Sequence, residues 1–175
     1  MTKKIALLAT DGVEEVEFTK PRDALVRAGA EAVLVSPKDK ILSTEGDIHP
    51  SESYKADLAL GRAKAADFDG LVLPGGTVNA DKLRIDADAV AFVRDFVASG
   101  KPIATICHGA WTLLEADGVA GQTLTSWPSL KTDLVRAGAT WVDEEYVRDG
   151  KLASSRNPKD LPAFCNGIVE LFEIA

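Results

Sequence analysis

The sequence predicts an α/β fold built around a mainly parallel sheet. Short apolar runs rich in valine, isoleucine and leucine alternate along the chain with longer segments whose apolar residues recur at helical spacing. Continuous apolar runs are typical of strands that are buried on both faces, as parallel strands usually are. Their alternation with helices favours right-handed crossovers between neighbouring parallel strands.

Length and composition fit one globular domain, which we expect to span residues 1–175. Of these residues 46% are hydrophobic and 27% are charged, and no repeat or linker divides the chain. The formal net charge of −7 argues against nucleic acid or an anionic membrane as the main partner. The N-terminal apolar run is too short for a secretory signal, and no stretch approaches the ~18–20 apolar residues of a membrane span. We therefore expect a cytoplasmic protein.

Prolines and glycines delimit the elements of the first half of the chain. Pro21 is tolerated in the first turn of a helix that Gly29 then ends. His49 lies between Ile48 and Pro50 in a segment with several turn formers, and we expect it to be exposed and without a role. The expected elements are a strand at residues 5–9, a helix from about 17 to 28, a strand at 31–36, a short hairpin with loops at 37–66 covering one edge of the sheet, and a strand at 69–73.

The second half of the chain continues the alternation. Asp149-Gly150 favours a tight type I′ turn and hence a hairpin. Cys165 is spaced from Leu161 and Ile168 so that it falls on the buried face of the last helix, which indicates a structural cysteine. The expected elements are a helix at 86–99, a strand at 103–106, a helix at 111–116, a strand at 121–126, a helix at 128–137, an extended segment at 140–142, a hairpin at 147–154 and a helix at 160–172.

Cys107 stands at a sharp turn between a strand and a helix. It directly follows the apolar run Ile103–Ile106, and no loop separates it from the next helix. Such a turn strains the backbone and projects one side chain into a cleft, and Gly109 relieves the crowding against the strand behind it. A thiol at a helix N-terminus also favours the nucleophilic thiolate. We therefore interpret Cys107 as functional rather than as a buried, inert cysteine.

Few other residues could complete a reactive site. The two cysteines and two histidines lack metal-ligand spacing, and we expect neither a metal nor a cofactor. A glutaminase would need a histidine after residue 108, and none follows. Gly75-Gly76, after a predicted strand, can turn backbone N–H groups toward a ligand at the carboxyl edge of the sheet.

Several motifs together resemble the PfpI family. They are Ala104-Thr105-Ile106-Cys107-His108-Gly109, Leu73-Pro74-Gly75-Gly76, Glu14-Glu15-Val16-Glu17, Thr125-Ser126-Trp127-Pro128 and Ser154-Ser155-Arg156-Asn157-Pro158. The family lies in a superfamily with the parkinsonism-associated deglycase and bacterial general-stress proteins. The resemblance implies a flavodoxin-like three-layer sandwich with Cys107 as nucleophile.

The resemblance also implies that Glu17 contacts the Cys107 thiol. A carboxylate beside a thiolate is a like-charge pair, so we expect Glu17 to hold a proton and to donate it to the sulfur. Glu17 could then act as a general acid or base. We interpret Glu14 and Glu15 as solvated charges at the start of the helix, although Glu14 is also a candidate for the substrate pocket.

His108 completes the site that the resemblance implies. In PfpI-like proteins an acid of a neighbouring subunit orients this histidine, and the nearest candidate here is Asp81. This would make activity depend on a homodimer or a higher homo-oligomer. The backbone N–H groups of Gly76 and His108 are the natural oxyanion hole, and Trp127 matches an aromatic that borders the pocket.

Three functions remain open at this point. The first is a stress-response hydrolase of reactive carbonyl adducts, of deglycase or glyoxalase type, that uses Cys107, Glu17 and His108. The second is an intracellular cysteine peptidase with a Cys107–His108–Asp81 triad. The third is a redox sensor or chaperone in which Cys107 oxidises without turnover.

Overall fold

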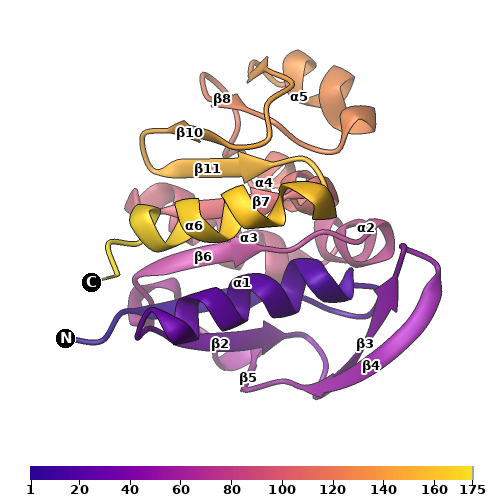
Figure 1. The fold of residues 1–175 in the computed structure, drawn as a ribbon, viewed down its shortest axis with the longest axis vertical. Helices are drawn as coiled ribbons and strands as arrows, with labels where there is room; N and C mark the ends of the chain where they lie inside the picture. Colours follow the sequence, from indigo (N-terminus) through magenta and orange to yellow (C-terminus); the bar gives the residue numbers. More distant parts are fainter. Residues whose placement is uncertain (175) are drawn as a thin grey trace.

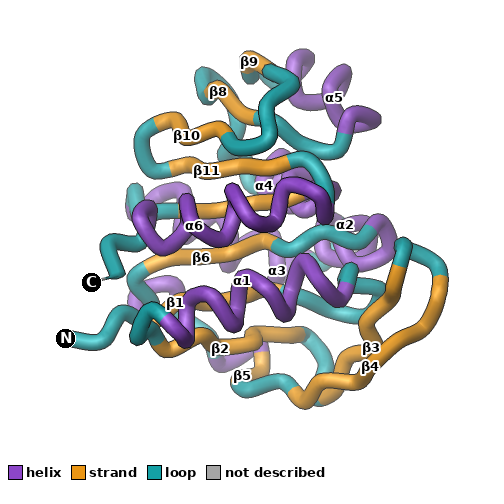
Figure 2. Tube along the Cα trace, viewed as in Figure 1, coloured by secondary structure: helices purple, strands orange, loops and turns teal. Residues whose placement is uncertain are grey.

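The computed structural model describes residues 1–174 as one sandwich of helices and strands (Figures 1 and 2). The strands are β1 (Lys4–Leu8), β2 (Glu31–Ser36), β3 (Lys40–Glu45), β4 (His49–Lys55), β5 (Leu58–Ala59), β6 (Gly70–Leu73), β7 (Ile103–Ile106), β8 (Thr123–Leu124), β9 (Thr140–Trp141), β10 (Val147–Asp149) and β11 (Leu152–Ser155). The helices are α1 (Glu15–Arg27), α2 (Thr77–Arg84), α3 (Ala87–Ser99), α4 (Ala110–Glu115), α5 (Lys131–Arg136) and α6 (Leu161–Leu171).

The central sheet is seven-stranded in the order β10-β11-β7-β6-β1-β2-β5. Every neighbouring pair in it is parallel except β10 and β11, which form the predicted antiparallel hairpin. The middle strands are buried on both faces, as their uninterrupted apolar runs predict. The expected α/β architecture with a mainly parallel sheet is confirmed.

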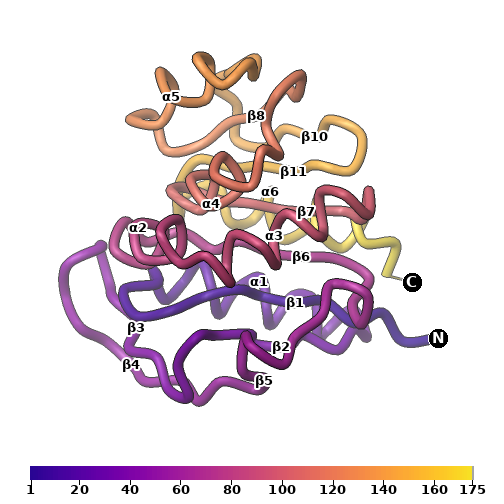
Figure 3. The backbone as a smooth tube through the Cα atoms, turned by 180° about the vertical axis from the view of Figure 1, so that it is seen from behind, coloured from indigo at the N-terminus to yellow at the C-terminus, as the bar shows by residue number. Residues whose placement is uncertain are grey.

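Helices cover both faces of this sheet and complete three layers. Helices α1 and α6 lie side by side over one face, where Phe18 and Phe164 are fully buried (Figure 1). Helices α2, α3 and α4 cover the other face, seen from behind in Figure 3, where Phe92 and Phe96 pack edge to face. The parallel strands thus end together at one edge of the sheet, where such folds place their sites.

The segment at residues 37–66 differs from the expectation. A hairpin forms from β3 and β4, but it is a separate two-stranded sheet, and β5 takes the edge position beside β2. The hairpin instead extends past the end of the sheet, and its tip is held by the start of α1. The sequence pattern predicts the hairpin but not its position against α1. The hydrogen bonds that hold the hairpin tip join residues about 30 positions apart, which no local pattern reports.

Several smaller points also separate prediction from structure. Helix α2 was not predicted, and the strand expected at 121–126 is the short β8, which pairs with β9 outside the main sheet. Cys165 is half-buried rather than fully buried, because it lies at the margin of the α1–α6 contact. His49 is exposed, as expected. No helix among residues 1–174 is both long and apolar enough to cross a bilayer.

Candidate active site

The strand-to-helix turn after β7 has the predicted strained geometry. Cys107 has a φ of 60°, in the left-handed region that is costly for a residue with a side chain. A single 3₁₀ turn follows, and α4 begins at Ala110. A Cβ at Gly109 would collide with the carbonyl oxygen of Leu73 on the neighbouring strand β6, so only glycine fits there.

The carboxyl group of Glu17 lies against Cys107. Glu17 projects from the first turn of α1 and is 0% exposed. Gly75 makes the approach possible, because a Cβ at this position would collide with the Glu17 carboxyl and lie 2.7 Å from the Cys107 Cβ. The strained turn, the double glycine after β6 and the start of α1 therefore meet at one point.

Burial decides the protonation of Glu17. Burial is the largest cause and the negative charge of Glu14 the next, and together they raise the pKa of this carboxyl from 4.5 to about 8, although the Cys107 thiol and the Gly75 amide act in the opposite direction. Neither carboxyl oxygen has a hydrogen bond of normal geometry among the described residues. Glu17 therefore holds its proton at neutral pH and keeps hydrogen-bonding capacity toward a bound group.

The thiol of Cys107 is not a thiolate at rest, which corrects the expectation from a helix N-terminus. Burial raises its pKa well above the ordinary value, and the Glu17 carboxylate would raise it further. The backbone N–H groups of His108 and Gly76 oppose this rise. Helix α4 starts three residues later and has only six residues, so its dipole is too weak to prevail. The thiol must lose its proton during the reaction.

His108 is the nearest acceptor for that proton. Its Nδ1 is 3.2 Å from the Cys107 Sγ, although the side chains of adjacent residues normally point apart. The 3₁₀ turn brings them together, and the imidazole packs between Trp111 and Trp127, with ring centroids 5.0 and 5.7 Å away. Burial lowers the pKa of His108, so the ring is neutral at pH 7 and can accept a proton.

A cavity of about 210 Å³ opens onto the thiol. It is lined by Glu14, Glu17, Gly46, Asp47, Cys107, Trp127 and Pro158. Trp127 forms one wall and is 39% exposed, so it lies at the mouth rather than in the core. The space suits a small adduct rather than a bulky substrate.

The other glutamates of the acidic segment do not behave as solvated charges. Glu14 lines the cavity, as one interpretation expected, but it is buried and accepts hydrogen bonds from the amides of Gly46 and Asp47 at 3.0 and 2.8 Å. Glu15 accepts hydrogen bonds from Tyr54 and Ser51 of the hairpin. Both carboxylates dock the hairpin onto the start of α1.

Within this chain the acid near His108 is not Asp81, whose predicted contact with His108 crosses a subunit interface and stays a prediction. Asp81 is exposed on α2, and within residues 1–174 no hydrogen bond or ion pair joins it to the site. Asp47, at the tip of the hairpin, is the acid whose charge acts on His108, Cys107 and Glu17. The Gly46-Asp47 turn is visible in the sequence, but its position over the site is not.

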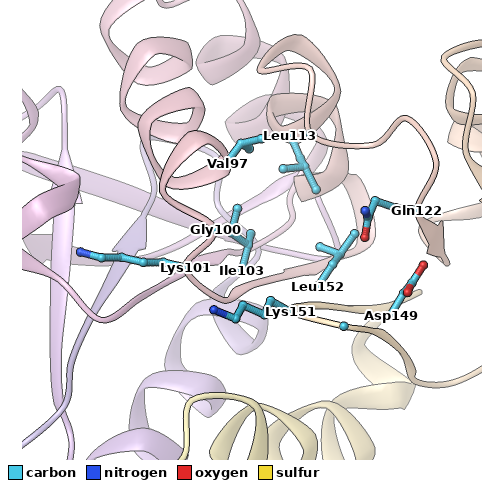
Figure 4. Close-up of a pocket in the computed structure, with 11 residues that line it drawn as sticks. Val97, Gly100, Lys101, Ile103, Leu113, Gln122, Asp149, Lys151 and Leu152 are labelled. Atoms are coloured by element: carbon cyan, nitrogen blue, oxygen red, sulfur yellow. The ribbon is translucent and has the colours of Figure 1, made fainter.

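A second cavity, of about 290 Å³, lies at the opposite end of β7 (Figure 4). Its lining includes Ile103 and Leu152, the first residues of two parallel strands, together with Lys101, Lys151 and Asp149. No cysteine or histidine lines it. Residues 1–174 also hold no cluster of three or more side chains able to bind a metal ion.

Over nearly its whole length, from residue 3 to residue 171, the chain matches one protein family, described as DJ-1/PfpI. The chain belongs to the DJ-1/PfpI family. The PfpI resemblance carried by the motifs is thereby confirmed.

Members of this family from distant organisms are similar to the chain. Protein/nucleic acid deglycase 2 of Escherichia coli is 41% identical over 94% of both chains, and deglycase PfpI of Pyrococcus furiosus is 35% identical over 97% of this chain and 99% of its own. The structure of Drosophila melanogaster DJ-1beta superposes with a TM-score of 0.89 at 30% identity, covering 100% of this chain and 91% of that one. These likenesses cover the site and the flavodoxin-like fold around it.

Proposed function

We propose that this chain is a stress-response cysteine-dependent hydrolase of reactive carbonyl adducts, of deglycase or glyoxalase type, acting in the cytoplasm. Two similar proteins carry the name deglycase. The observation that carries the proposal is the fully buried Glu17 carboxyl, whose pKa of about 8 leaves it protonated beside a nucleophilic sulfur. A neutral acid in a small cavity can protonate a carbonyl oxygen as the sulfur adds to it.

In the proposed reaction, Cys107 loses its proton to His108 and its sulfur bonds to the aldehyde carbon of methylglyoxal. Where that carbon already carries a thiol, amine or guanidino group, the same step releases this group with a proton. Glu17 and His108 then move a proton from the aldehyde carbon to the neighbouring keto carbon, and the hydroxyl proton of the first carbon passes to the keto oxygen. This leaves a lactoyl thioester on Cys107. Water hydrolyses the thioester to lactate and restores the thiol. The sum is one methylglyoxal and one water consumed for one lactic acid formed, with no external oxidant.

The backbone N–H groups of Gly76 and His108 are proposed as the oxyanion hole. Both already lie close enough to the Cys107 sulfur to act on its pKa. An oxygen on the carbon that bonds to this sulfur would fall within reach of the same donors. Trp127 and Glu14 are proposed to bound the substrate, because both line the cavity.

The test is lactate production by the purified protein from methylglyoxal and from methylglyoxal-treated N-acetylcysteine and N-acetylarginine. We expect lactate to form with the wild type and not with Cys107→Ser. Cys165→Ser is the matched control, because it removes the other thiol and leaves the site intact. Equal lactate yields from wild type and Cys107→Ser would contradict the proposal.

A cysteine peptidase is the second candidate. It is favoured by the 3.2 Å contact between Cys107 and His108, and by a similar Bacillus subtilis protein, YraA, whose name assigns it provisionally to the cysteine proteases. This function would draw on Asp81 of a neighbouring copy in a homodimer or higher homo-oligomer. Peptide cleavage that is lost in Asp81→Ala while lactate formation persists would assign peptidase activity to the assembled site.

Oxidation of Cys107 without turnover is the third candidate. The oxygens of Glu17 that lack a partner are placed to hydrogen-bond a sulfinate on Cys107. The raised pKa of the thiol opposes rapid oxidation, because the thiolate is the form that oxidises. A gain of two oxygen atoms on Cys107 after mild peroxide treatment, in a protein that forms no lactate, would favour this candidate.

A further inference from the structure

The tip of the β3–β4 hairpin is fixed over the active site. Asp47 occupies the tip with a φ of 68°, in the left-handed region. The carboxylate of Glu14 accepts hydrogen bonds from the amides of both Gly46 and Asp47, and Thr44 pairs with Glu14 through the backbone. Three contacts thus hold one acidic side chain in a defined place.

The carboxylate of Asp47 is bonded to the first residue of α2. Its Oδ1 accepts from the backbone N–H of Thr77 at 2.9 Å, and its Oδ2 accepts from the Thr77 hydroxyl at 2.7 Å. The first contact caps α2, whose preceding residue Gly76 offers no side chain for this purpose. The second contact has a different consequence, because it uses the only proton of the hydroxyl group.

The oxygen of that hydroxyl group faces the catalytic imidazole. The Thr77 Oγ1 is 3.4 Å from both Nδ1 and Nε2 of His108, so it lies against the ring rather than in line with one nitrogen. Its lone pairs face the ring, since its proton is directed to Asp47. This arrangement favours the imidazolium form of His108, in which both ring nitrogens carry a proton.

The charges around His108 act in the same sense. Burial lowers the pKa of His108, and the negative charge of Asp47 is the influence that opposes it. The other titratable groups nearby are Cys107, the buried Glu17 and Glu14, and Arg84, which lies behind Trp111 with its guanidinium 5.1 Å from the indole ring. The carboxylate of Glu14 already accepts hydrogen bonds from the hairpin amides. Asp47 is therefore the carboxylate that is linked to the His108 ring, through Thr77.

We propose that Asp47, acting through Thr77, is the positioning acid of His108 within a single chain. The Asp47–Thr77 pair holds the imidazole against the Cys107 sulfur and stabilises the imidazolium that forms when His108 takes the thiol proton. The proposal rests on the proposed role of His108 as proton acceptor. With Asp47 in this role, Asp81 of a neighbouring subunit is not needed to orient His108, and a single subunit can perform this proton transfer.

The test separates positioning from helix capping and needs no carbonyl substrate. Thr77→Val keeps the backbone cap and the Asp47 charge but removes the hydroxyl oxygen, whereas Thr77→Ser retains it. We expect alkylation of Cys107 by iodoacetamide to be slowed in Thr77→Val by about fivefold, the effect of one lost polar contact to the imidazolium, and to be restored in Thr77→Ser. Alkylation of Thr77→Val at the wild-type rate would overturn the proposal.

A second readout follows the histidine itself. The ring resonances of His108 are assigned against His49→Gln, since these are the only histidines. Asp47→Asn is expected to lower the pKa of His108 by removing the charge that supports the imidazolium, while Glu45→Gln, an exposed neutralisation two residues away, leaves it unchanged. A lower melting temperature with an unmoved His108 titration would reduce Asp47 to a helix cap. If neither the wild type nor any variant forms lactate, the rate of Cys107 alkylation and the titration of His108 still decide the proposal.

Discussion

The two cysteines of this chain lie on the same face of the sheet and differ in almost everything that matters for chemistry. Burial raises the pKa of both thiols, that of Cys165 to about 11. Lys20 and Arg27 favour the thiolate of Cys165, whereas the charges that act against a Cys107 thiolate are those of Glu17, once it is ionised, and of Asp47. Charge alone would therefore select Cys165 as the more acidic thiol.

What distinguishes Cys107 is the set of proton carriers around it. An imidazole nitrogen lies 3.2 Å from its sulfur, a protonated carboxyl is packed against it, and two backbone amides face it. Cys165 lies in an open groove between α1 and α6, beside Lys20 and Arg27. A buried thiol becomes useful when its proton has somewhere to go, and only one of the two cysteines meets that condition.

The largest expected effect on lactate formation comes from replacing each of the two cysteines by serine in turn. Cys107→Ser should lower lactate formation by roughly 10⁴-fold or more, as loss of a nucleophile does. Cys165→Ser should leave the rate within about twofold of wild type, because it touches no group of the site. Comparable losses in both variants would erase the distinction between the two cysteines.

Removing the acid should be the next most severe change. Glu17→Gln keeps the shape of the side chain but cannot give up or take a proton, so the turnover rate should fall on the order of 10²–10³-fold. The decline of the rate at alkaline pH, which reports ionisation of the carboxyl at about pH 8, should disappear. Steady-state rates across pH 6–9 measure both effects; a variant with the wild-type profile would show that Glu17 carries no proton in the reaction.

Packing around the thiol can be tested at a glycine. Gly75→Ala would force a methyl group into the space shared by the Glu17 carboxyl and the Cys107 Cβ. We expect a loss of about 1–3 kcal/mol in the free energy of unfolding, together with reduced turnover. Gly61→Ala is the matched control, since nothing lies within 4 Å of its added Cβ, and it should be neutral in a urea titration. A neutral Gly75→Ala would mean that carboxyl and thiol are not in contact.

The pH dependence of stability gives the mildest test. The folded chain raises the pKa of Glu17 from 4.5 to about 8, so it binds this proton more tightly than the unfolded chain does. The resulting stabilisation is complete below about pH 4.5 and is lost as pH rises toward 8, at up to about 1.4 kcal/mol per pH unit.

Glu17→Gln should flatten this decline in urea titrations between pH 5 and 8. Glu15→Gln is the control with the opposite sign, because hydrogen bonds from Ser51 and Tyr54 lower the pKa of Glu15. Its stabilisation is lost on the acid side, below the ordinary carboxyl pKa. A decline that persists unchanged in Glu17→Gln would have to come from another group.

The sequence predicted the parts of the molecule that depend on local patterns. The buried strands, the turn at Cys107 and the tight Asp149-Gly150 hairpin follow from apolar runs and turn residues, and the structure has them all. The family motifs singled out Glu17 as the carboxyl beside the thiol, and the structure places it there.

The remainder depends on contacts between distant residues. The protonated resting thiol results from burial, which no local pattern reports, and it reverses the thiolate expected from the helix N-terminus. Asp47 reaches the site only because Glu14 holds the hairpin tip across 33 residues. Asp81, which the resemblance pairs with His108 of a neighbouring subunit, lies exposed on α2, a helix that the sequence did not predict, and this pairing stays a prediction.

The most direct test is the titration of the Glu17 carboxyl itself by carbon-13 NMR, with Glu17→Gln used to assign its side-chain resonance. A proton retained beside the sulfur at neutral pH predicts a midpoint at about pH 8. A midpoint near the ordinary value of 4.5 would contradict it, because Glu17 would then face Cys107 as a carboxylate with no proton to give.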